Sequence, residues 1–144
     1  MPGKDFRYIE HMTDSVVEAY GATLEEAFEN SARGLVNTMY DLKKVTPKII
    51  INMEVKGFDL KNLLYNWLEQ VLLYSIVDKI VLSRFKVDIA GGTDDNYLLS
   101  CSSKGERFNI DKHGYKVEVK AVTYHEMEIR EERSKFSIRF LLDL

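Results

Sequence analysis

The sequence ends in an acid beside an aliphatic residue, Asp143-Leu144. Before them, from Phe136 to Leu142, apolar side chains recur at every second position, the period of a half-buried β-strand. Most domains let their last residues fray, so a strand that continues to Asp143 is either trimmed by chance or anchored. If it is anchored, it offers a side-chain carboxylate and main-chain oxygens close together. Hard cations such as Ca²⁺, Mg²⁺ and Mn²⁺ prefer such oxygen ligands.

A second group that could do chemistry comprises His11 and Asp14, three residues apart at an expected bend. An acid there can ligate a metal or cap a turn, and the turn is the simpler interpretation of Asp14 alone. Asp143 alone is likewise most simply interpreted as a surface acid on a strand. The two acids matter more together, because strands from opposite ends of a chain frequently pair. A single cation would then offset the repulsion between the carboxylates.

Other polar residues carry weaker signals. His125 ends the segment Lys120–His125, which is expected to close a strand, and it could be a base, a ligand or a hydrogen-bond partner of Tyr124. Glu106, Asp111 and His113 are expected in a solvated hairpin loop bounded by glycines. Phosphate-binding loops, dinucleotide-binding glycine motifs and metalloprotease or hydrolase signatures are absent from the sequence. An enzyme with independent turnover is therefore disfavoured.

Length and composition indicate one ordinary globular domain over residues 1–144, with 45% hydrophobic and 30% charged residues. The net charge of −3 argues against tight stand-alone binding to nucleic acid, although it leaves shared contact with RNA open. The single cysteine, Cys101, excludes an internal disulfide and favours a cytoplasmic protein. We expect no secretory signal and no membrane span, since no apolar run approaches about 18 residues.

Hydrophobic periodicity predicts the elements that would position these residues. Two helices are expected, one capped by Thr23 and ending near Lys43-Lys44, the other capped by Asp59 with an apolar face wide enough to be covered on more than one side. The order ββαβαββββ predicts an α+β fold with two helices packed on a mainly antiparallel β-sheet. The strands are expected near 6–10, 14–20, 47–57, 81–89, 97–101, 115–121 and 136–142.

Six segments in order carry a resemblance to a known family. They are EHMTD at 10–14, GATLEEAF at 21–28, LLYNWL at 63–68, GE at 105–106 with DKH at 111–113, VKAVTYH at 119–125, and the terminal DL. Together they resemble archease over essentially the whole chain, most specifically in KAVTYH and the acid-plus-aliphatic ending. The first segment departs slightly, because the family commonly has His-Thr-Ala-Asp there. The acid and the histidine are kept.

The resemblance implies a function and a site. Archeases assist the GTP-dependent RNA ligase that joins 2′,3′-cyclic-phosphate or 3′-phosphate ends to 5′-hydroxyl ends, as in tRNA splicing. A non-catalytic activator is implied, which promotes guanylylation of the ligase's active-site histidine, supports repeated turnover and meets tRNA only through the ligase. A divalent metal site is also implied, usually described with Ca²⁺, with Asp14, Asp143 and the main chain of Leu144 as ligands. His11, Lys120 and His125 are candidate supporting residues.

Two alternatives remain open from the residues. A general protein or RNA chaperone for tRNA processing or modification enzymes would bind RNA with a steep salt dependence. A small metal-dependent hydrolase would use Asp14, Asp143 and a bound water, but it lacks a general base close in sequence. Aspartate and main-chain oxygens accept several hard cations, so Mg²⁺ or Mn²⁺ would also suit the site.

Overall fold

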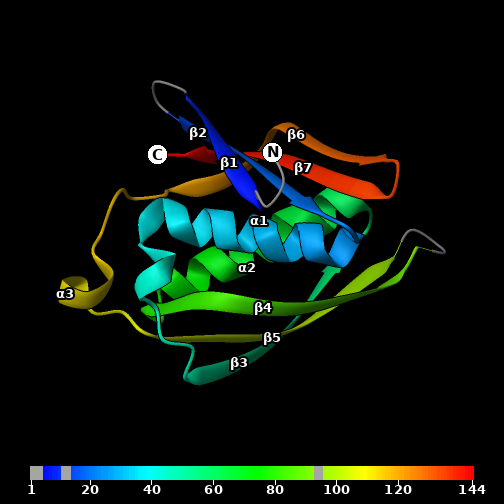
Figure 1. The fold of residues 1–144 in the computed structure, drawn as a ribbon. Coiled ribbons are helices and arrows are strands. Elements are labelled where there is room, and N and C mark those ends of the chain that lie inside the picture. Colours follow the sequence, from blue (N-terminus) through cyan, green and yellow to red (C-terminus); the bar gives the residue numbers. More distant parts are fainter. Residues whose placement is uncertain (1–4, 11–13, 93–95) are drawn as a thin grey trace.

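The structure, a computed structural model, describes residues 5–10, 14–92 and 96–144 (Figure 1). It confirms the predicted order of strands and long helices and adds two short helical turns. The elements are β1 Phe6–Glu10, β2 Asp14–Gly21, α1 Leu24–Met39, the 3₁₀ turn η1 Leu42–Lys44, β3 Ile49–Gly57, α2 Leu60–Ile76, β4 Ile80–Gly91, β5 Tyr97–Arg107, α3 Ile110–His113, β6 Ala121–Glu132 and β7 Lys135–Asp143.

The strands form two antiparallel sheets instead of one. The first has the order β1-β2-β7-β6 and the second has the order β3-β5-β4. Helices α1 and α2 lie between the two sheets (Figure 1). The α+β class is confirmed, and so is the expectation that the second helix is covered on more than one side. The division into two sheets escaped prediction, because a two-residue period identifies strands but not their partners.

Local capping signals place the helix starts correctly. The side chain of Thr23 accepts the N–H of Glu26 at 3.1 Å, and the side chain of Asp59 accepts the N–H of Asn62 at 2.7 Å. The predicted end of the first helix at Lys43-Lys44 is wrong. Helix α1 ends at Met39, since Tyr40 is extended and Asp41 begins the separate turn η1.

The expected strand at 115–121 is also wrong. Residues 114–120 join α3 to β6 without belonging to either sheet, and β6 begins only at Ala121. Lys120–His125 therefore opens a strand instead of closing one. The alternation arises because this stretch lies against the core, where Val119 is buried, while Lys116 donates its N–H to the carbonyl of Met39 at 2.8 Å.

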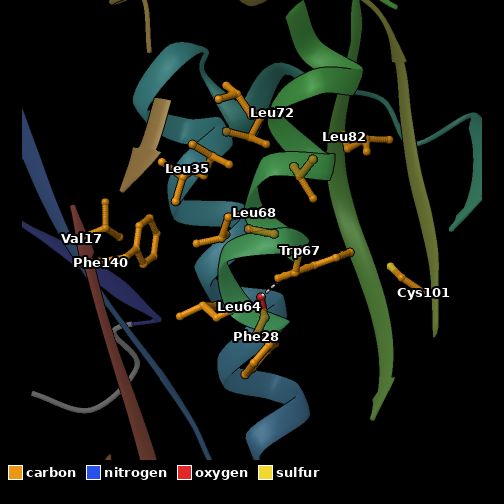
Figure 2. Packing of buried hydrophobic residues seen from close by; sticks show 14 of the residues in the cluster. Val17, Phe28, Leu35, Leu64, Trp67, Leu68, Leu72, Leu82, Cys101 and Phe140 are labelled. Atoms are coloured by element: carbon orange, nitrogen blue, oxygen red, sulfur yellow. Dashed lines mark hydrogen bonds between the residues drawn. The ribbon is translucent and has the colours of Figure 1, made fainter. Parts of the chain in front are cut away.

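The core fills the space between the sheets around α1 and α2. Figure 2 shows Val17 and Phe140 of one sheet on one side of the helices, and Leu82 and Cys101 of the other sheet on the opposite side. Trp67 is fully buried, and its indole N–H donates to the carbonyl of Phe28 at 3.0 Å. This contact ties the two helices together and satisfies the one polar atom of the largest core side chain.

Candidate functional site

The first and last long strands of the chain pair with each other. Strand β2 runs antiparallel to β7 in a register that starts at Asp14 opposite Asp143 and continues to Gly21 opposite Phe136. Directly opposed residues project from the same face, with Cα atoms roughly 4.5–5.5 Å apart. The prediction that the two ends lie side by side is confirmed. The sharing of a cation by the two carboxylates stays a prediction.

Strand β6 completes the surroundings of Asp143 on its other side. Ala121 is the register partner of Asp143, and the N–H of Lys120 donates to the carbonyl of Asp143 at 2.8 Å. The Leu144 side chain packs against the core, so the aliphatic residue anchors the strand end. We call Asp14, Lys120, Asp143 and Leu144 the terminal tip. In it, Asp14 is half-buried and Asp143 is exposed.

The donor atoms of the terminal tip are oxygens, the ligand type that hard divalent cations prefer. Two carboxylates from adjacent strands stand on one face, and like charges directly opposite each other destabilise a strand pair. Within residues 5–10, 14–92 and 96–144, no group of three or more His, Cys, Asp or Glu side chains could hold a metal. Ca²⁺ takes about six to eight oxygens, so main-chain oxygens such as those of Leu144, together with water, would complete the shell.

The candidate supporting residues have different places. His11 lies outside the described residues. Lys120 belongs to the terminal tip through its main chain, and its side chain is exposed. His125 is four residues beyond Ala121, roughly 13 Å at 3.3 Å per residue, in a bulge of β6 between Thr123 and Glu128. Its side chain is 77% exposed, and its Nε2 lies 3.9 Å from Glu126 Oε2 of the same bulge.

A second carboxylate centre was mistaken for a solvated loop. Glu106 and His113 are buried, and Glu106 Oε1 lies 2.7 Å from both Lys112 Nζ and His113 Nε2. The N–H of Thr46 donates to the same oxygen at 2.9 Å, and Lys48 Nζ lies 3.6 Å from Oε2. The hydrogen bond from Lys112 is the main cause that lowers the pKa of Glu106 to about 2. We call Glu106, Lys112, His113, Thr46 and Lys48 the Glu106 centre.

The protonation of His113 follows from its neighbours. The Nδ1 atom accepts the N–H of Asn109 at 3.0 Å, so the proton of the neutral ring is on Nε2 and points at Glu106. Both ring nitrogens are engaged, which identifies this centre as a structural clamp for α3. The sequence signal for it was the archease-like pair of segments at 105–106 and 111–113, since spacing alone did not predict the burial.

Comparison with known proteins decides the family. The Archease protein family (MTH1598/TM1083) matches the chain over residues 6–144. The chain belongs to the archease family. Protein archease of Sulfurisphaera tokodaii is 38% identical over 139 residues, 96% of this chain and 98% of that protein. Protein archease of Thermococcus kodakarensis is 43% identical over 126 residues, 88% of each chain.

Solved archease-like structures agree with the fold. The solution structure of Methanobacterium thermoautotrophicum protein 1598 matches with a TM-score of 0.82 and 34% identity, over 97% of this chain and 99% of that one. The crystal structure of a Thermotoga maritima archease, described as a possible chaperone, matches with a TM-score of 0.58 and 17% identity over 94% of each chain, which shows likeness of fold alone. In the described parts of this archease-family chain, no helix has the length and apolar character needed to cross a membrane.

Proposed function

We propose that this archease-family protein is a non-catalytic accessory protein that activates a GTP-dependent RNA ligase. In the cytoplasm it promotes guanylylation and repeated turnover of the ligase. It does so through the terminal tip, which holds a divalent cation, with Ca²⁺ as the first candidate. The observation that carries the proposal is the register of Asp14 opposite Asp143, from strands at opposite ends of the sequence. The archease ligand set corresponds to these two acids and the main chain of Leu144.

Each residue of the terminal tip has a physical role in this proposal. The carboxylates of Asp14 and Asp143 supply the negative charge, and the bond from the Lys120 N–H fixes the main chain of Asp143. When bound, the cation supplies positive charge that organises triphosphate oxygens. The exposed side chain of Lys120 adds a further positive charge for those phosphates. The Leu144 side chain anchors the tip to the core, so it meets the ligase as a rigid projection.

Cys101 and His113 are both occupied in the structure in ways that favour an accessory role over catalysis. Cys101 is buried, and burial raises the pKa of its thiol to about 12, so it supplies no thiolate near neutral pH. His113 is fully engaged in the Glu106 centre. The net charge of −3 favours contact with tRNA through the ligase over direct binding.

The test is multiple-turnover ligation by a cognate ligase with wild type, Asp14→Ala, Asp143→Ala and the control Asp88→Ala. Asp88 is an exposed acid on β4. Both tip variants should lose stimulation by about a hundredfold, since outer-shell changes at metal sites already cost about 10–100-fold, and the control should keep it. Undiminished stimulation by both tip variants would remove the tip from the mechanism. Tight, salt-sensitive binding of bare tRNA by the isolated protein would favour the chaperone alternative.

A further inference from the structure

Exposed large apolar side chains gather at one end of the molecule. The described parts of the chain have nine such side chains. Five of them lie in the last turn of α2, directly after α2, in α3, or shortly after α3. Val77 and Ile110 are 67% and 63% exposed. Residues three and four apart are neighbours on a helix surface, so the α2 members form one strip. We call this set the apolar patch: Leu73, Ile76, Val77, Ile110 and Tyr115.

A pocket of about 300 Å³ opens within the apolar patch. Ile76 and Ile110 line it together with the aromatic residues Tyr40, Phe108 and Tyr115. The ring of Tyr40 is centred 5.1 Å from that of Phe108 and 6.0 Å from that of Tyr115. Large apolar patches with aromatic side chains are typical of protein interaction sites.

The hydroxyl of Ser75 is a buried polar group in the lining of this pocket. Ser75 lines the pocket and is 1% exposed, and its Oγ has no hydrogen-bond partner among the described residues. A buried hydroxyl without a partner is unfavourable and rare. The oxygen is covered in the free protein, so a polar atom inserted into the pocket would pair with it once the lining shifts to uncover it.

The pocket lining and the terminal tip are adjacent along the chain. Glu118 and Val119 line the pocket, and the next residue, Lys120, donates its N–H to the carbonyl of Asp143. The pocket wall at Glu118 and the tip at Lys120 are thus two residues, or roughly 7 Å, apart along the chain. Figure 1 shows the segment from α3 to β6 running along the end of the molecule where the C-terminus lies.

We propose that the apolar patch is the docking site for the ligase and that its pocket receives one large apolar side chain of that protein. This inference rests on the proposed function and adds to it the surface that positions the tip. A protein segment fits better than nucleic acid, because the pocket carries charges of both signs, Lys79 and Glu118, instead of a concentrated basic surface. The polar atom that pairs with Ser75 belongs to the inserted segment.

The experiment measures the affinity of the full-length protein for a purified cognate ligase by calorimetry, with ligation assayed over a range of doses. The patch variants are Ile110→Lys and Tyr115→Ser, with Ser75→Ala at the pocket. Matched controls are Ile50→Lys and Phe58→Ser, which are 60% and 63% exposed at other places. All five are checked for unchanged thermal unfolding. We expect the two exposed patch variants to bind about tenfold more weakly, as anchor residues of interfaces do.

The dose dependence separates docking from the action of the tip. Ile110→Lys should reach full stimulation at about tenfold higher dose, because its tip is intact. Asp143→Ala should bind with near-normal affinity and fail to stimulate at any dose. Ser75→Ala should weaken binding by a few-fold, since it removes one hydrogen bond, while Ile50→Lys and Phe58→Ser should stay within about twofold of wild type.

Three results would overturn the inference in different ways. Normal affinity in both Ile110→Lys and Tyr115→Ser, with stimulation still lost in Asp143→Ala, refutes the docking site and leaves the proposed function standing. A wild-type protein that neither binds nor stimulates the ligase refutes both. A wild-type dimer in sedimentation that Ile110→Lys converts to a monomer identifies a second copy of this chain as the occupant.

Discussion

Two groups of carboxylates in this protein differ in the side chains and main-chain groups that surround them. In the Glu106 centre, one buried carboxylate is surrounded by donors from its own chain, among them Lys112, His113 and the N–H of Thr46. In the terminal tip, the carboxylates of Asp14 and Asp143 stand on adjacent strands in direct register. Among the described residues, no ion pair joins Lys120 to Asp143, although their main chains are hydrogen-bonded.

The difference separates a carboxylate that holds two segments of the fold together from two acids that strand pairing brings face to face. Glu106 holds α3 against the start of β3, and its charge is compensated within the protein. At the terminal tip, strand pairing brings two acids of the same sign together, and like charges directly opposite each other destabilise a strand pair. A centre of this second kind is expected to respond to added metal, and the first kind is not.

The largest expected effect is a metal-dependent gain in stability at the terminal tip. Ca²⁺ at a hundred times its Kd should raise the free energy of unfolding by about 2.7 kcal/mol, because it binds the folded state. Thermal unfolding with Ca²⁺ or with a chelator measures this gain. Asp143→Asn should abolish it, whereas Glu106→Gln should keep it. An equal gain in Asp143→Asn would show that the cation binds elsewhere.

Removal of the Glu106 carboxylate should come next in size. Glu106→Ala leaves the buried Nε2–H of His113 without its acceptor and loosens α3, so we expect a loss on the order of 2 kcal/mol in the free energy of unfolding. Urea denaturation at neutral pH measures it. The control is Glu54→Ala on β3, an exposed acid whose removal should change stability by less than about 0.5 kcal/mol. Equal losses of stability in the two variants would show that the buried contacts of Glu106 do not stabilise the fold.

The free energy of unfolding should also fall at acid pH, where Glu106 becomes protonated. The pKa of Glu106 is about 2 in the folded protein, against an ordinary value of 4.5, chiefly because of the hydrogen bond from Lys112. Its stabilising effect is therefore complete above about pH 4.5 and is lost as pH falls toward 2. Denaturation midpoints across this range should fall more steeply for wild type than for Glu106→Gln. Parallel curves would contradict the lowered pKa.

The smallest effects are expected at the two candidate supporting residues. Lys120→Ala should lower ligase stimulation by a few-fold, and more at low salt, since Lys120 is an exposed charge at the tip. His125→Ala should change stimulation by less than about twofold, because His125 lies in the bulge of β6, four residues beyond the register partner of Asp143. Ligation assays at two salt concentrations compare them. A larger effect of His125 than of Lys120 would mean that the bulge of β6 touches the ligase.

The sequence predicted those features that depend on neighbours along the chain. Thr23 and Asp59 cap helices as expected, because capping is a contact over three residues. The pairing of the end strands was an inference from general tendency and from the family resemblance, and the register of Asp14 with Asp143 confirms it.

The features that the sequence did not predict depend on contacts between segments that are distant along the chain. The burial of Glu106 and His113 results from the docking of α3 beside η1 and β3, over separations that no local pattern reports. The alternation at 115–121 predicts a strand, but residues 114–120 lie outside both sheets and Val119 among them is buried in the core. The apolar patch was missed for a similar reason, since α2 and α3 meet only in the folded chain.

The central claim concerns the acids of the terminal tip and the guanylylated ligase. The direct measurement is the fraction of a cognate ligase that carries GMP after incubation with GTP, Ca²⁺ and a substoichiometric amount of this protein. Wild type should raise that fraction well above the amount of protein added, and Asp143→Asn should leave it at the level of the ligase alone. Equal GMP occupancy with wild type and Asp143→Asn would contradict the account.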